Sequence, residues 1–283
     1  MQAEQFIKEG NLTEALKSLQ DSIRADPANA DYRAFLYQLL CIMGQWDRAL
    51  TQINVVGDMT PGELLMVEFY RNAIRCEALR QEVFAGKTTP LMLGEPEEWL
   101  GWMVQATGLV AQGNVAAAAE LRDQAFEQAP AIDGTINGEA FEWLADTDHR
   151  LGPIMEVIIQ GKYYWVPFNH ISAIKIDPPG SLRDMVWAQA QFIWSNKGKA
   201  VGLIPVRYPG TGETGSDAEK LAHATSYKDL DDGYCIGSGQ RVFASSQSET
   251  PILETRLLTF GPQDDEDAAQ AESAESAGAD AHG

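Results

Sequence analysis

The sequence has few cysteines, no signal-peptide pattern and no long apolar run. Its three cysteines, Cys41, Cys76 and Cys235, are far apart and form no Cys-x-x-Cys pair. We therefore expect reduced thiols, not disulfides or a metal site. No apolar stretch approaches the roughly 18 residues that a transmembrane helix requires, and the first residues are polar. These absences predict a cytoplasmic protein that does not insert into a membrane.

Clustered positive charge is also missing. The 283 residues include 41 Asp and Glu but 21 Lys and Arg, which gives a formal net charge of −20. Binding to a phosphate backbone requires grouped Lys and Arg, so the charge argues against nucleic acid and against anionic membrane surfaces. A protein partner with a basic face would instead be attracted over long range.

One pattern is repeated near the start of the chain at a spacing of 34 residues. The run Gly10-Asn11-Leu12-Thr13-Glu14-Ala15-Leu16 is answered by Gly44-Gln45-Trp46-Asp47-Arg48-Ala49-Leu50, and a third copy begins at Gly113. A period of 34 is that of the tetratricopeptide repeat, a helical hairpin that buries its apolar face by stacking on copies of itself. The pattern predicts a tetratricopeptide-like helical hairpin array over residues 1–150. The expected helices are 13–25, 31–43, 47–56, 61–85, 97–112, 116–128 and a final one at 139–148.

From residue 152 the helical spacing gives way to short alternating runs of β-branched and aromatic residues. Asn196-Lys197-Gly198 is typical of a tight hairpin turn between two such runs. Several short strands with almost no helix predict a mostly antiparallel β-barrel-like domain over residues 151–261, because closure removes exposed strand edges. The expected strands are 154–159, 163–166, 171–176, 185–194, 200–206, 234–236, 240–244 and 256–260, with 209–233 as surface loop.

The last segment, residues 262–283, differs from the rest in composition. It holds seven acidic residues, no basic residue and no aromatic residue. Such a segment buries too little apolar surface to fold, so we expect a disordered acidic tail.

Motifs that carry chemistry are weak in this sequence. Residues 210–216 are glycine-rich, but they lack the Gly-Lys-Ser/Thr ending of a phosphate-binding loop. Asp146 and His149 could hold a metal only with further ligands, and a role at a helix end explains them better. We predict no catalytic, cofactor-binding or metal-binding residues.

Recognition of a partner is the function that remains. Stacked hairpins curve, and the concave side exposes the first helix of each pair, which suits the apolar face of a partner helix. The alternative is that the aromatic residues of this side simply pack between repeats. The predicted partner-binding residues are Tyr32, Phe35, Leu39, Tyr70 and Trp99.

A motif begins near residue 150 and continues to residue 187. Its residues are Asp146, Asp148, Arg150, Pro153, Glu156, Tyr163, Trp165, Pro167, Phe168, Asp184 and Trp187. Together with the segments 203–210 and 239–241, this motif resembles the ImpE family, also called SciE or TagJ, of type VI secretion accessory proteins. The resemblance covers about residues 1–260.

The resemblance implies a non-catalytic adaptor that binds a helix near the N-terminus of the small subunit of the contractile sheath and assists sheath assembly or recycling. Two alternatives stay open: a general scaffold or chaperone for another secretion component, and a hydrolase or ligand-binding activity in the β domain. For the motif itself we expect Arg150 to join Asp146 and Asp148 in a network that fixes the angle between the domains. Direct contact with the partner is the other interpretation.

Overall fold

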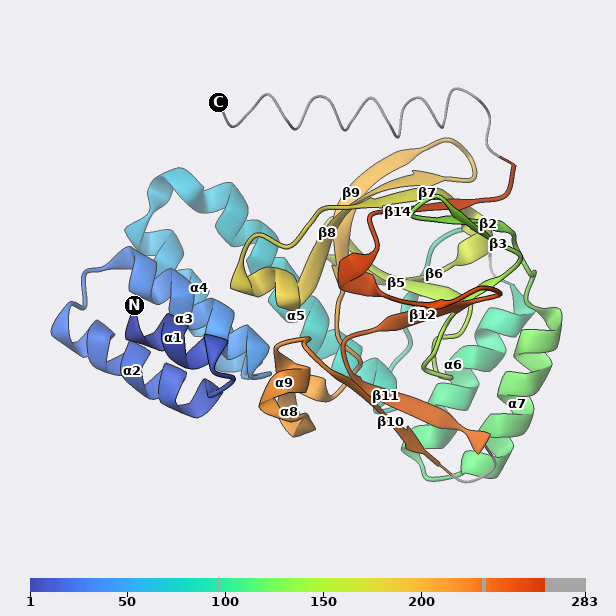
Figure 1. The fold of residues 1–283 in the computed structure, drawn as a ribbon, viewed down its shortest axis with the longest axis horizontal. Helices are drawn as coiled ribbons and strands as arrows, with labels where there is room; N and C mark the ends of the chain where they lie inside the picture. Colours follow the sequence, from blue (N-terminus) through green and yellow to red (C-terminus); the bar gives the residue numbers. More distant parts are fainter. Residues whose placement is uncertain (96, 231–232, 263–283) are drawn as a thin grey trace.

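The computed structural model describes residues 1–95, 97–230 and 233–262. The predicted acidic tail therefore lies almost wholly outside the described residues. The helical array comes first in the chain, interrupted by one short strand at Leu91–Met92, and the other strands follow (Figure 1). The helices are α1 (Gln2–Lys8), α2 (Leu12–Ala25), α3 (Ala30–Ile42), α4 (Trp46–Met59), α5 (Leu64–Phe84), α6 (Glu98–Ala111) and α7 (Val115–Gln128).

The repeated glycines end three helices in the same way. Gly10, Gly44 and Gly113 follow α1, α3 and α6 with φ angles of 72°, 66° and 79°. In each case the glycine N–H and the following N–H donate back to carbonyls of the last helical turn, which is the Schellman arrangement. The repeat seen in the sequence is thus a repeated helix ending, followed by a returning helix.

The predicted barrel is wrong, because the large sheet stays open. Its nine strands lie in the order β1-β6-β5-β9-β8-β7-β14-β2-β3, with β1 and β3 as separate edges. All pairings in this sheet are antiparallel except that of β1 with β6. The strands are β1 (Leu91–Met92), β2 (Gly134–Ile136), β3 (Glu139–Phe141), β5 (Ile154–Ile159), β6 (Lys162–Pro167), β7 (Ile171–Ile176), β8 (Trp187–Trp194), β9 (Lys199–Pro205) and β14 (Leu257–Phe260).

The helix expected at residues 139–148 is also wrong. This segment forms β3 and then β4 (Leu144–Asp146). The cause is the turn before it: Asn137 and Gly138 both have positive φ, at 52° and 85°, which is the type I′ hairpin geometry that joins β2 to β3. The hairpin expected at Asn196-Lys197-Gly198 is confirmed, since β8 and β9 pair along seven positions on either side of it.

Smaller elements cover the second face of the large sheet. A three-stranded sheet is formed by β4, β12 (Val242–Ser245) and β13 (Glu249–Pro251), and β10 (Thr225–Asp229) pairs with β11 (Cys235–Gly239). The expected loop at 209–233 contains β10 and two short helices, α8 (Thr211–Thr214) and α9 (Asp217–Lys220).

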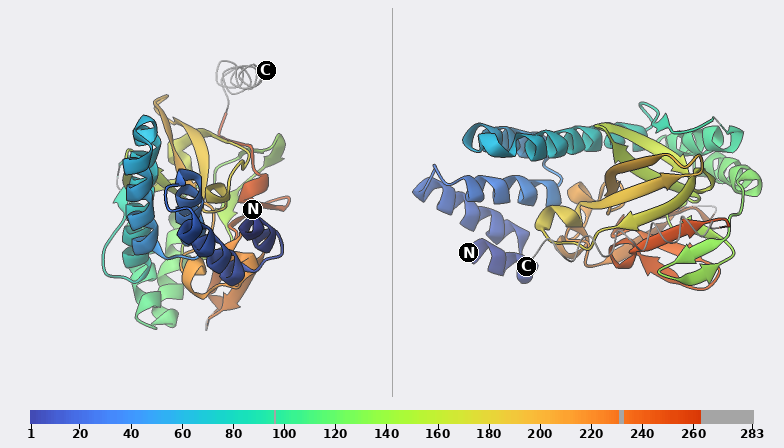
Figure 2. Two further views of the ribbon diagram at one scale, coloured as in Figure 1. Left: turned by 90° about the vertical axis from the view of Figure 1, so that its left-hand side faces the viewer. Right: turned by 90° about the horizontal axis from the view of Figure 1, so that it is seen from above.

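The helical array and the sheet share one hydrophobic core. Along β5, Ile154 and Ile158 belong to the core that also holds residues of α1 to α6, whereas Met155 and Val157 belong to the core on the other face. This alternation follows from the period of two in a strand. The 21-residue helix α5 runs from the array onto the sheet, so it links the two parts (Figure 2).

Candidate functional site

The predicted partner-binding residues are largely turned inward. Leu39, Tyr70 and Trp99 are only 0%, 2% and 3% exposed, so they are part of the core and present almost no surface to a partner. Tyr32 and Phe35 are half-buried and pack against the same core. The packing alternative therefore describes the three buried residues better than direct contact does.

A short segment of this chain covers the face where a partner helix was expected. The 3-10 helix η3 (Leu182–Met185) packs against α3. The backbone N–H of Arg183 donates to Gln38 at 3.3 Å, and its guanidinium lies 4.4 Å from the ring centre of Tyr70 on α5. Asp184 holds this segment in shape by accepting from the N–H groups of Gly180 and Ser181 at 2.9 and 2.7 Å. The motif residue Asp184 thus stabilises the turn that precedes η3.

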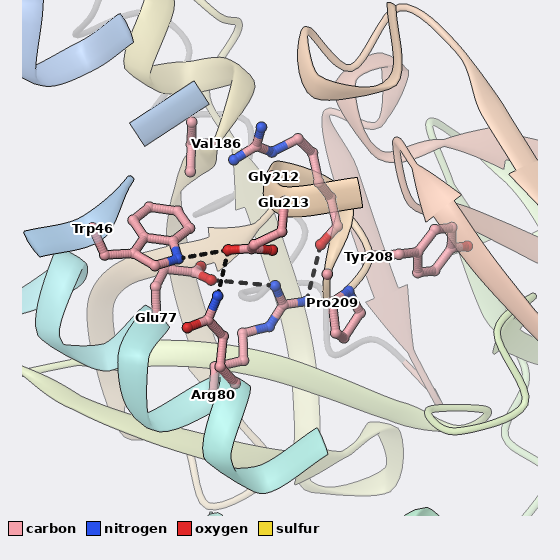
Figure 3. Close-up of a pocket in the computed structure, with 11 residues that line it drawn as sticks. Trp46, Glu77, Arg80, Val186, Tyr208, Pro209, Gly212 and Glu213 are labelled. Atoms are coloured by element: carbon pink, nitrogen blue, oxygen red, sulfur yellow. Dashed lines mark hydrogen bonds and ion pairs between the residues drawn. The ribbon is translucent and has the colours of Figure 1, made fainter. Parts of the chain in front are cut away.

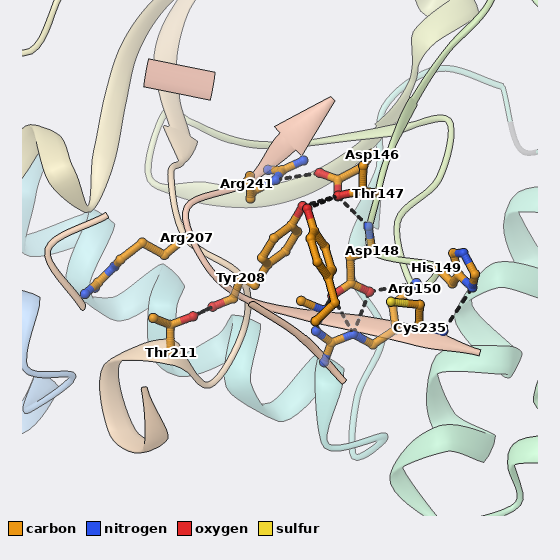
Figure 4. Close-up of polar contacts among 12 residues, drawn as sticks. Asp146, Thr147, Asp148, His149, Arg150, Arg207, Tyr208, Thr211, Cys235 and Arg241 are labelled. Carbon is orange, nitrogen blue, oxygen red and sulfur yellow. Dashed lines mark hydrogen bonds and ion pairs between the residues drawn. The ribbon is translucent and has the colours of Figure 1, made fainter. Parts of the chain in front are cut away.

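A buried ionic network joins α5 to the sheet. Arg80 of α5 binds both oxygens of Glu156 on β5, at 2.7 and 2.8 Å. Glu156 also contacts Arg241 at 3.3 Å, and Arg241 donates to Asp146 at 2.8 Å. Glu156 and Arg241 are fully buried, and Asp146 is 3% exposed. Arg80, Glu156, Arg241 and Asp146, which come from four segments, therefore form one continuous series of contacts. Figure 4 shows its last pair, Arg241 and Asp146.

Aromatic residues of the motif complete this network. The hydroxyl of Tyr163 donates to Glu156 and accepts from the indole N–H of Trp165 at 2.7 Å. Trp187 donates to Glu77, one turn before Arg80, at 3.0 Å. Burial would raise the pKa of Glu156, but the two arginines and these hydrogen bonds hold it below its ordinary value.

Arg150 pairs with Asp148, and Asp146 joins them only by accepting from the backbone N–H of Asp148 at 2.9 Å. Arg150 Nε donates to Asp148 at 2.9 Å, and Asp148 also accepts from the N–H of Gly237 at 2.9 Å (Figure 4). The guanidinium of Arg150 lies 5.1 Å from the ring centre of Phe84, near the end of α5. The expected partner Asp146 binds Arg241 instead. The contact with Phe84 does place Arg150 between the sheet region and the array, and its role in fixing their angle stays a prediction.

The remaining motif residues are structural. The N–H of Phe168 donates to the carbonyl of Pro153 at 3.1 Å, and its ring stacks on Phe260 with centres 5.2 Å apart. Pro167 pairs with Ile154 in the β5–β6 register. These contacts join the ends of β5 and β6 to β14.

A second junction lies at the turn between α3 and α4. Arg207 donates to the carbonyls of Ile42 and Cys41 at 2.6 and 3.1 Å, so a buried guanidinium binds the end of α3, where the Cys41 carbonyl also accepts from the N–H of Gly44. Burial lowers the pKa of Arg207 to about 10, against the attraction of Glu77. Beside it, Glu213 of α8 accepts from Trp46 at 3.1 Å, at the edge of a small pocket (Figure 3).

Sequence reasoning missed Glu77 and Arg80 and gave Arg207 and Arg241 no role. On a helix, a glutamate three residues before an arginine indicates an exposed surface pair. The sequence does contain a sign that Glu77 and Arg80 are buried: they continue the helical spacing from Ile74 to Val83, and both of these apolar residues are buried.

Asp146 gives a testable pH dependence. Burial raises its pKa to about 6 from an ordinary value of 3.8, although Arg241 opposes the rise. Folding therefore takes up a proton between these pH values, and the free energy of unfolding falls as pH rises through this window. Asp146 thus makes the wild type more stable at pH 5 than at pH 7. We expect Asp146→Asn to remove this contribution, about 1 kcal/mol of the difference in unfolding free energy between the two pH values, as measured by urea denaturation. The matched control, Glu139→Gln on exposed β3, should keep the wild-type profile; an unchanged profile in Asp146→Asn would contradict the assignment.

The fold and these contacts define a class of protein: a helical-hairpin array fastened by a buried ion pair to an open, mostly antiparallel sheet. Within residues 1–95, 97–230 and 233–262, no group of three His, Cys, Asp or Glu side chains could hold a metal ion. Over the same ranges, every helix is too short or too polar to cross a bilayer.

Comparison with known proteins identifies the family. A family model described as ImpE protein matches residues 138–259. The chain is 47% identical over 264 residues to the type VI secretion system accessory component TagJ of Pseudomonas aeruginosa, covering 93% of this chain and 92% of that protein. This chain therefore belongs to the ImpE (TagJ) family of type VI secretion accessory proteins, which confirms the resemblance found in the sequence.

The fold is shared with a solved structure. The X-ray structure of a Vibrio parahaemolyticus protein matches with a TM-score of 0.86 at 27% identity, over 93% of this chain and 98% of that one. The arrangement of array and sheet is therefore found in a more distant relative as well.

Proposed function

We propose that this protein is a cytoplasmic, non-catalytic adaptor of the type VI secretion system. In this proposal it binds a helix near the N-terminus of the small subunit of the contractile sheath and assists sheath assembly or recycling. The observation that carries the proposal is the likeness to TagJ along nearly the whole of both chains. The helical array supports it, because stacked helical hairpins commonly present surfaces to partner proteins.

The interior of the β region gives no support to the hydrolase or ligand-binding alternative. The space between the large sheet and the three-stranded sheet is filled by apolar side chains, among them Phe168, Phe192, Phe243 and Phe260. A ligand site in this place would need a cavity with a few converging polar groups. The described residues fill the interior instead.

Calorimetric titration tests the adaptor proposal. The full chain is titrated with a peptide spanning the N-terminal helix of the cognate small sheath subunit, because the array and the sheet share a core and separated halves would expose it. We expect saturable binding with a Kd on the order of micromolar. A peptide of the same composition in scrambled order, which loses the amphipathic spacing, serves as the control. Absence of binding by the ordered peptide would overturn the proposal.

A further inference from the structure

The start of α5 exposes large apolar side chains. Leu65 is 91% exposed, the highest value among the exposed large hydrophobic residues of the described chain, and Leu64 and Phe69 are 54% and 39% exposed. Leu65 and Phe69 are four residues apart, so they lie one above the other on the same face of the helix. Single exposed apolar residues are ordinary, whereas three within two turns form a patch.

The patch lies where α5 extends beyond the sheet. Figure 2 shows α5 beginning well outside the strands and reaching them only in its second half. The boundary is at Asn72 and Cys76: the first lies against Gly161 in the β5–β6 turn, and the second donates to the carbonyl of Gly161 at 3.4 Å. Phe69, one turn earlier, has an exposed flank. This chain therefore covers the α5 face from Asn72 onward and leaves its first turns open.

Acidic side chains surround the patch. Asp58, Glu63 and Glu68 are all exposed: Asp58 is at the end of α4, Glu63 directly precedes α5, and Glu68 is on its second turn. The end of α4 is close to α5, because a Cβ at Gly57 would lie 3.0 Å from Val67. Glu68 is paired with Arg71 at 2.6 Å, while Asp58 and Glu63 form no ion pair among the described residues. The local field is therefore negative, as is the whole chain.

We infer that Leu64, Leu65 and Phe69, with Asp58 and Glu63 at their rim, form a docking surface for an amphipathic helix that carries basic residues beside its apolar stripe. An apolar helix face with acidic neighbours is complementary to such a helix in both hydrophobicity and charge. The inference rests on the proposed function, and it locates that function at the start of α5. η3 already packs against α3 and covers Tyr70 of α5, whereas Leu64, Leu65 and Phe69 remain exposed.

Substitution of Leu65 tests the surface. In calorimetric titration of the full chain with the sheath-subunit helix peptide, we expect Leu65→Asp to weaken binding tenfold or more. The variant loses a leucine that the bound peptide would cover, and it places a charge in an apolar interface. The control is Val201→Asp on β9, where the side chain is 66% exposed and distant in the fold; it should leave the Kd within about twofold of wild type. Both positions are exposed, so both variants should keep the wild-type melting temperature.

Charge reversal tests the acidic rim. The double variant Asp58→Lys with Glu63→Lys is expected to slow association about threefold or more and to flatten its dependence on salt concentration, measured by stopped-flow fluorescence with a labelled peptide. Wild type that fails to bind would overturn the proposed function and, with it, this inference. Wild type that binds while Leu65→Asp binds equally well would overturn the docking surface alone and leave the proposed function standing.

Discussion

Replacing Arg80 by alanine is expected to lower the free energy of unfolding by about 3–5 kcal/mol. The change removes both hydrogen bonds to Glu156 and leaves a fully buried carboxylate with Arg241 as its remaining charged partner. A buried charge that loses its pair keeps its desolvation cost without the compensating attraction. Guanidinium denaturation followed by tryptophan fluorescence measures the loss.

A neighbour on the same helix provides the control. Arg75 lies five residues earlier on α5, is exposed, and makes one long hydrogen bond to Asn72 at 3.4 Å. Arg75→Ala should therefore change the unfolding free energy by about 0.5 kcal/mol or less. Arg80→Lys keeps the charge but loses the two-point contact with Glu156, so its loss of unfolding free energy should be larger than that of Arg75→Ala and smaller than that of Arg80→Ala. This variant provides the measurement if Arg80→Ala does not fold. A loss below about 1 kcal/mol in Arg80→Ala would show that the network contributes little.

Replacing Gly44 by alanine is expected to destabilise the protein far more than the same change at Gly10. Both glycines end a helix in the same Schellman motif with φ near 70°, so both variants carry the same conformational penalty of about 1 kcal/mol. A Cβ at Gly10 meets nothing within 4 Å, whereas one at Gly44 would lie 2.7 Å from the backbone carbon of Gly212. We expect an additional loss of about 1–3 kcal/mol at Gly44, because the backbones of the two segments must move apart.

Thermal melting of the two variants, with Gly113→Ala as a second open position, isolates this contact. Gly113 also meets nothing within 4 Å at its Cβ position. Equal losses at Gly10, Gly44 and Gly113 would mean that the close approach of Gly212 is easily relieved. A larger loss confined to Gly44 would identify the α3–α4 turn as a point where array and sheet region are held together.

The helical array could be predicted because its signals are local. A glycine that ends a helix and a small residue that lets two helices approach each other are determined within one repeat, as at Gly44 and Ala49. The β8–β9 hairpin was predictable for the same reason, since Asn196, Lys197 and Gly198 define their own turn. In residues 139–148 the local signal was present but misread: Asn137-Gly138 favours a hairpin, and this outweighs the helical propensity of Glu139 and Ala140.

The features of the fold that could not be predicted depend on contacts between segments distant in the sequence. Whether a sheet closes is decided by what covers its edges and faces, and here α5, from the helical region, covers one face. Arg80 and Glu156 are 76 positions apart, so the pattern around either residue does not show that they will meet. The burial of Leu39, Tyr70 and Trp99 was hidden for the same reason, because η3, which packs against α3, belongs to a segment more than 140 positions later in the chain. The division at residue 150 stays a prediction, although the two parts share a core.

The ionic network also constrains the order in which the chain folds during synthesis. Arg241 follows Arg80 by 161 positions. At translation rates of roughly 5–20 residues per second, a ribosome makes Arg241 about 8–32 s after Arg80. Throughout this interval Arg80 and Glu156 lack Arg241, the group that completes their buried network. We therefore expect α5 to reach its native packing after Arg241 has been made, and not as each repeat of the array emerges.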